Sequence, residues 1–168
     1  MKEKLNAETL TLAFCVALLP PIWAVLAPHI HVSTGAVALI CAGMYVLGGN
    51  DRHNAVPLTA GFLLGDLWAY LALKTMDLLS WNEDLELFLT LFIMGGLAVL
   101  LSALCPRLIS CPAWLCGWAV GLTILTPLGI ENTGTTPFEI AVSMLAGVWY
   151  VGLFLDLVQK KLLKFFKK

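Results

Sequence analysis

A single carboxylate interrupts an otherwise apolar stretch of the chain. The segment 61–70 reads GFLLGDLWAY, and Asp66 is its one charged residue. A charged side chain at membrane depth is costly when it faces lipid, so such a residue usually faces a cavity or a partner. Burial favours the neutral acid, which can donate a hydrogen bond to a solute, and an acid that titrates can carry a proton. Asp66 is therefore either part of a solute pathway or the source of a structural hydrogen bond between helices.

The residues around Asp66 extend this candidate site. Helical spacing of three and four residues places Phe62, Ala69 and Tyr70 on its face, with Thr59 two turns earlier. Tryptophans elsewhere either narrow a path or form interfacial belts and helix contacts. With the asparagines of two polar loops added, the candidate pathway residues are Asp66, Thr59, Phe62, Tyr70, Trp68, Asn50, Asn132 and Trp149.

Other residue types suggest little further chemistry. His29 and His31 form an HIH motif that can sense external pH, since histidine titrates near neutrality, or be two ordinary surface side chains. Two histidines are too few ligands for a metal site. Because the sequence shows no nucleophile–base pair or dense polar cluster, we expect neither an enzyme nor a cofactor.

The segments that carry these residues have the composition of a membrane protein. Of the 168 residues, 60% are hydrophobic and 12% are charged, against about 25% charged in soluble proteins. The charges separate apolar runs whose length is close to the roughly 20 residues of a membrane-spanning helix. We expect an all-α membrane protein, one domain over 1–158 with six transmembrane helices, at roughly 9–28, 34–49, 57–76, 87–105, 113–130 and 138–158.

The basic residues predict the orientation. If both termini are cytoplasmic, the inner segments hold nearly all of them, as the positive-inside rule requires. The chain is then a multi-pass protein of the bacterial inner membrane. The segment 159–168, QKKLLKFFKK with its first residue at 159, is a basic amphipathic tail that either lies on the anionic inner leaflet or binds a partner. The basic residues assigned to the inner side are Lys2, Lys4, Arg52, Arg107, Lys160, Lys161, Lys164, Lys167 and Lys168.

The order of features suggests an internal repeat with halves at about 9–76 and 87–158. Each half contains a short glycine-bearing span, then a polar connection ending in proline, then a helix with tryptophan. Three spans per half invert the second half relative to the first, and inverted repeats recur in transporters. The alternative is that two membrane halves look alike because both are rich in Leu, Ala and Gly. The helices with tryptophan that finish the two halves are GDLWAYLAL (65–73) and AGVWYVGLFL (146–155).

The two polar connections, 50–57 and 130–137, fall on opposite faces of the membrane in this topology. Both combine asparagine, an acid and a closing proline, which suits the first turn of the next helix. One interpretation is a pair of vestibules or re-entrant segments, which are allowed only where backbone is shielded from lipid. The other is a pair of ordinary turns.

These features resemble the YcdZ-like family of uncharacterised bacterial inner-membrane proteins. The resemblance depends on IWAVLA (22–27), LGGNDRHNAVP (47–57), GDLWA (65–69) and CPAWLCGWAVG (111–121). It implies five or six spans and no settled substrate. The architecture is also similar to that of the bacterial urea and short-amide channels, which are rings of six-span subunits with inverted halves. No motif here identifies urea as the solute.

These observations favour a channel or facilitator for a small polar, uncharged solute. The alternatives are a proton-coupled secondary transporter that uses Asp66 and a non-transporting scaffold or regulatory subunit. The expected partners are membrane lipid, a small-molecule solute and further copies of the chain in a homo-oligomer. A net charge of -1 gives no reason to expect nucleic acid.

Overall fold

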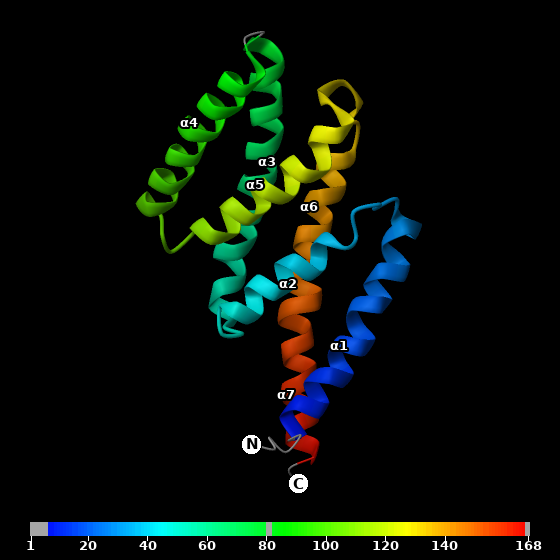
Figure 1. Ribbon diagram of the computed structural model, residues 1–168. Helices are drawn as coiled ribbons and strands as arrows, with labels where there is room; N and C mark the ends of the chain where they lie inside the picture. Colours follow the sequence, from blue (N-terminus) through cyan, green and yellow to red (C-terminus); the bar gives the residue numbers. More distant parts are fainter. Residues whose placement is uncertain (1–6, 80–81, 167–168) are drawn as a thin grey trace, which may run out of the picture.

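A computed structural model describes residues 7–79 and 82–166, and every regular element in those residues is a helix (Figure 1). Lys2, Lys4, Lys167 and Lys168, which contributed to the predicted orientation, lie outside the described residues. Among the described residues, five helices are long and apolar enough to cross a membrane. The prediction of an all-α protein of membrane type is confirmed.

The helices follow one another through short turns. The C-terminal part of the described chain forms one continuous apolar helix, Thr136–Phe165, in which a π-helical stretch joins two α-helical ones. The elements are α1 (Ala7–Leu26), a 3₁₀ turn (Ala27–Ile30), α2 (Val37–Leu47), a 3₁₀ turn (Arg52–Asn54), α3 (Ala55–Leu79), α4 (Glu83–Leu104), α5 (Cys111–Leu125), two 3₁₀ turns (Thr126–Leu128 and Ile130–Asn132), α6 (Thr136–Ala146), a π-helix (Gly147–Phe154) and α7 (Leu155–Phe166).

Each of the six predicted spans coincides with an apolar helix, but they are not of equal length. The predicted span 34–49 contains only α2, whose 11 residues fall short of the roughly 20 that cross the hydrocarbon core. The helix ends before Gly49, whose φ of 82° does not continue a right-handed helix. This second span is therefore a short internal helix beside five long ones.

The closest helix packing joins α3 to α5. A Cβ atom added at Gly61 would lie 2.5 Å from the Ser110 carbonyl oxygen, and one at Gly117 would lie 2.6 Å from the Phe62 oxygen. At Gly65 it would collide with the Trp114 carbonyl oxygen. Because these glycines lack side chains, the two backbones touch, as small residues allow between membrane helices. Successive contacts advance along both helices together, so α3 and α5 run parallel.

The second close contact joins α2 to the π-helix. A Cβ atom at Gly147 would collide with the Ala38 carbonyl oxygen, and one at Gly152 would lie 3.0 Å from the Tyr45 ring. These helices also run parallel. The third helix of each half of the chain thus packs mainly on the second helix of the other half.

The two third helices run antiparallel to each other. The indole nitrogen of Trp149 donates a 3.0 Å hydrogen bond to the Thr59 hydroxyl near the start of α3, whereas residues further along α3 face the start of α6. The two remaining long helices lie outside these contacts: α1 packs on α7, and α4 packs on α3. The start of α1 and the end of α7 lie at the same end of the molecule (Figure 1).

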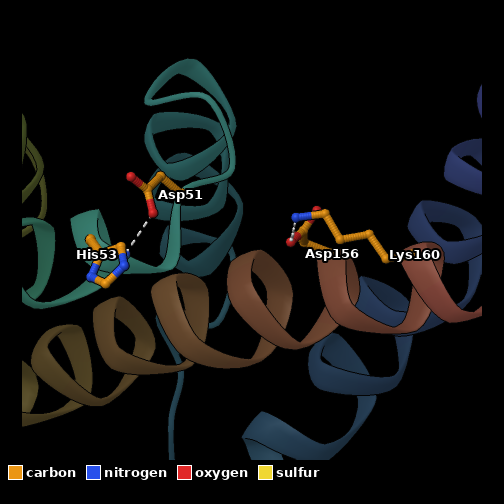
Figure 2. Close-up of polar contacts among 4 residues, drawn as sticks. All are labelled: Asp51, His53, Asp156 and Lys160. Atoms are coloured by element: carbon orange, nitrogen blue, oxygen red, sulfur yellow. Dashed lines mark hydrogen bonds and ion pairs between the residues drawn. The ribbon is translucent and has the colours of Figure 1, made fainter.

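The basic segment predicted as a tail continues the last helix. In α7, Leu155, Val158 and Leu162 pack against Cys15 and Leu19 of α1. The Lys160 ammonium lies 2.6 Å from the Asp156 carboxylate (Figure 2), as their four-residue spacing predicts. The aspartate side chain is 7% exposed and the lysine 58%, so only the lysine side of this pair meets solvent.

Candidate functional site

Asp66 lies near the middle of α3 and is buried, with 6% of its surface exposed. Its Oδ1 atom has no hydrogen-bond partner within residues 7–79 and 82–166. Across the helix contact lies Gly121 of α5, where an added Cβ would be 3.5 Å from the same oxygen. A buried polar atom without a partner costs free energy. At Oδ1, therefore, Asp66 does not form the structural hydrogen bond between helices that the sequence offers as an alternative.

A pocket of about 390 Å³ borders this carboxylate. One wall is α3, and the opposite wall is the start of α6 with the loop that precedes it. The volume lies within the roughly 300–1,000 Å³ typical of small-molecule sites. The lining residues are Leu63, Asp66, Leu67, Tyr70, Thr133, Gly134, Pro137, Phe138 and Ala141.

The pocket has few polar groups. Thr133 is buried and its hydroxyl donates 3.0 Å to the Ile130 carbonyl, and Tyr70 adds a phenol. None of the lining residues is a lysine, an arginine, a histidine or a second acid. Phe138 and Leu67 are 79% and 50% exposed, so the pocket opens on the flank of the bundle. It can hold a small molecule with an apolar body and one polar end directed at Asp66.

The structure brings together only some of the residues predicted for the pathway. Asp66 and Tyr70 share the pocket. Thr59 accepts the hydrogen bond from Trp149 and donates to the Ala55 carbonyl, so these two form a helix contact. The Trp68 indole donates 3.0 Å to the Met94 carbonyl of α4.

The remaining predicted residues lie elsewhere. Phe62 is fully buried in the core against α5. Asn50 adopts a φ of 55° and lines a different pocket beside Asp156. Asn132 donates to the Leu128 carbonyl within its own turn, one residue before Thr133. The pathway residues predicted from the sequence are therefore spread over several places.

The two loops with histidine have ordinary turn geometry. His31 ends a 3₁₀ turn with a φ of 59°, and His29 Nδ1 lies 2.8 Å from the Val25 carbonyl oxygen. His53 donates its backbone N–H to Asp51 Oδ1 at 2.9 Å (Figure 2), which caps the turn before α3. The described residues contain no cluster of three or more potential metal ligands.

Sequence reasoning missed most of the pocket wall. Thr133 and Phe138 come from a polar loop and the helix start that follows it, a region the sequence marks as a possible vestibule. Which loop residue turns inward depends on Gly129 and Gly134, whose φ values are 70° and 47°. The polar connection was a usable signal, but the inward residue was Thr133 and not Asn132.

Other pockets lie along the bundle. One of about 770 Å³ includes His53 and Arg107, and one of about 430 Å³ includes Asn50 and Lys160. Neither shares a residue with the pocket at Asp66. The pocket at Asp66 is thus a recess between α3 and the start of α6, separate from these two.

Comparison with known protein families identifies the family of this chain. Residues 13–159 match the family described as "Protein of unknown function (DUF1097)". The chain belongs to this family. Comparisons with curated proteins and with solved structures found no match. The match covers all six apolar helices, from within α1 into α7, and the whole pocket at Asp66 lies inside it.

Proposed function

We propose that the protein lets a small polar, uncharged solute cross the bacterial inner membrane, with Asp66 bordering its path. The observation that carries this proposal is the buried Asp66 carboxyl group, which has no hydrogen-bond partner at Oδ1 in the described residues and belongs to a residue that lines the pocket. A membrane protein retains such a costly group when it serves a ligand or an ion. A mainly apolar wall with a few polar groups is typical of small-molecule sites.

The proposal includes two inverted halves. Its support is the exchange of partners described above: each third helix packs on the second helix of the other half, and the two third helices run antiparallel (Figure 1). Inverted-repeat transporters place the solute site near the midplane between the halves. The resemblance to the YcdZ-like family, which depends on sequence motifs, and the architectural similarity to the urea channels belong to this same proposal.

The proposed orientation has both termini cytoplasmic. Arg52, Arg107 and the lysines of α7 then lie inside, and the loop with Thr133 lies outside. The proposed assembly is a homo-oligomer, because neighbouring copies would cover part of the exposed apolar surface of α4. Membrane lipid would contact the remainder.

The test is solute flux in proteoliposomes. Stopped-flow swelling is measured with urea, acetamide and glycerol for the wild type, Asp66→Asn and Asp77→Asn. Asp77 is an exposed aspartate of the same helix, so it is a matched control. We expect one or more of these solutes to enter faster than into empty vesicles, and the rate to change in Asp66→Asn alone. Rates equal to those of empty vesicles for all three solutes contradict the proposal.

A second candidate is proton-coupled transport through Asp66. It is favoured by the separation of the pocket at Asp66 from those near the other loops, since a recess suits alternating access better than an open pore does. This mechanism predicts that an imposed pH gradient drives uptake and that Asp66→Asn abolishes the driven component. Uptake that follows the solute gradient alone favours the facilitator.

A further inference from the structure

The pocket at Asp66 has a chemical bias that narrows the class of ligand. Its single ionisable acid has an oxygen without a partner, and its lining contains no cationic side chain. When this carboxylate is ionised, none of the lining side chains supplies a counter-charge, so a positive charge has to come from a bound cation. A charge-assisted hydrogen bond from an ammonium group is about twice as strong as a neutral one.

The walls specify the rest of the ligand. Leu63, Leu67 and Phe138 supply apolar surface, and Phe138 and Leu67 are exposed at the rim. A molecule with an apolar body can therefore enter from the flank of the bundle and lie with its polar end at Asp66. An anion of the same shape would meet the carboxylate directly, at a cost in free energy.

The charged features near the pocket permit this arrangement. The start of α6 lies at the mouth, where the helix dipole is positive. Glu139 in the first turn offsets that end, and it is held by hydrogen bonds from the Ser33 backbone N–H at 2.8 Å and from the Thr135 hydroxyl at 3.0 Å. Among the lining residues Tyr70 is the only other titratable group.

We propose that the pocket between α3 and the start of α6 binds a small protonated amine with an apolar body, its ammonium group at the Asp66 carboxylate. This inference rests on the proposed function, because it names a ligand class for the same site. The amine either crosses by that path or occupies it and blocks the uncharged solute.

The test compares three ligands that share a phenethyl body and differ in their polar end: phenethylammonium, 3-phenylpropionamide and 3-phenylpropionate. Each is titrated into purified protein in nanodiscs by isothermal titration calorimetry at pH 7. We expect the ammonium ligand to bind most tightly and the carboxylate most weakly. Asp66→Asn should weaken ammonium binding about tenfold or more, and Asp77→Asn should leave it unchanged. Tighter binding of the amide than of the amine, or equal amine affinity in Asp66→Asn, overturns the inference.

A flux measurement separates this inference from the proposed function. Phenethylammonium is added to the proteoliposomes used for swelling, and we expect inhibition that Asp66→Asn removes. Amine binding that depends on Asp66, in vesicles through which no solute moves, supports the ligand class and contradicts solute passage. Asp66-dependent flux that the amine does not inhibit supports solute passage and overturns the ligand class.

Discussion

At the scale of single residues, burying the Asp66 carboxyl group costs free energy that no hydrogen bond at Oδ1 offsets within the described residues. Its Oδ1 is buried without a partner in this part of the chain. In the proposed repeat, GDLW (65–68) aligns with AGVW (146–149), so Gly147 stands where the first half has the acid. The proposed halves thus differ at this place. We interpret the acid as a functional residue that reduces stability.

Replacing the acid should therefore stabilise the protein. We expect Asp66→Val to raise the free energy of unfolding by about 1 kcal/mol or more, because it removes an unsatisfied buried group whose cost is about 1–3 kcal/mol. The measurement is unfolding in detergent, followed by circular dichroism. Destabilisation of the same size would show that the carboxylate makes a structural contact.

The sequence predicted Asp66 and Tyr70 but not their surroundings. Their helical spacing is a local property, so it can be read from a single segment. The contact between Thr59 and Trp149 joins residues far apart in the chain, and no local pattern indicates it. Thr133 lines the pocket next to Gly134, whose φ is positive. Composition does not determine such a backbone conformation, so the sequence did not identify Thr133.

At the scale of elements, the fold depends on glycines where helices cross. The sequence indicated six apolar segments and showed which of them carry glycine. Hydropathy and small residues are local signals that can be read from a single segment. It did not indicate that α2 is short or that the last helix contains a π-helical stretch. Both depend on packing, since Gly147 and Gly152 of the π-helix lie against α2.

The crossing of α3 and α5 gives a prediction for this scale. A methyl group at Gly65 would collide with the backbone of Trp114 and Trp118, so Gly65→Ala should destabilise the protein by about 1–3 kcal/mol. The measurement is thermal unfolding in detergent. Gly96→Ala in α4 is the control, because nothing lies within 4 Å of its added methyl group, and alanine is the better helix former. Equal stability of Gly65→Ala and the wild type would contradict the close crossing.

At the scale of the whole molecule, the third helix of each half packs on the second helix of the other half. The loop with Asn132 and the loop with Arg52 follow the second helices of the two halves, and the proposed inverted arrangement puts them on opposite sides of the membrane. The ends of the described chain lie on one side (Figure 1). In the proposed orientation this side is cytoplasmic, and Arg52, Arg107 and Lys164 are assigned to it.

Reporter fusions test the topology. Alkaline phosphatase needs disulfides, which form in the periplasm and not in the cytosol. We expect a fusion after Asn132 to be active and a fusion after Arg52 to be inactive. Equal activity of the two fusions would contradict opposite faces and with them the inverted halves.

The central claim is that water reaches Asp66 through the pocket between α3 and the start of α6, whose preceding loop lies outside in the proposed orientation. We would replace the five cysteines by alanine, introduce Asp66→Cys or Val148→Cys, and treat sealed vesicles of known orientation with a membrane-impermeant thiol reagent. The account predicts labelling of Asp66→Cys from the outer face and none of Val148→Cys, which is fully buried. An Asp66→Cys variant that folds but is labelled from neither side would contradict it.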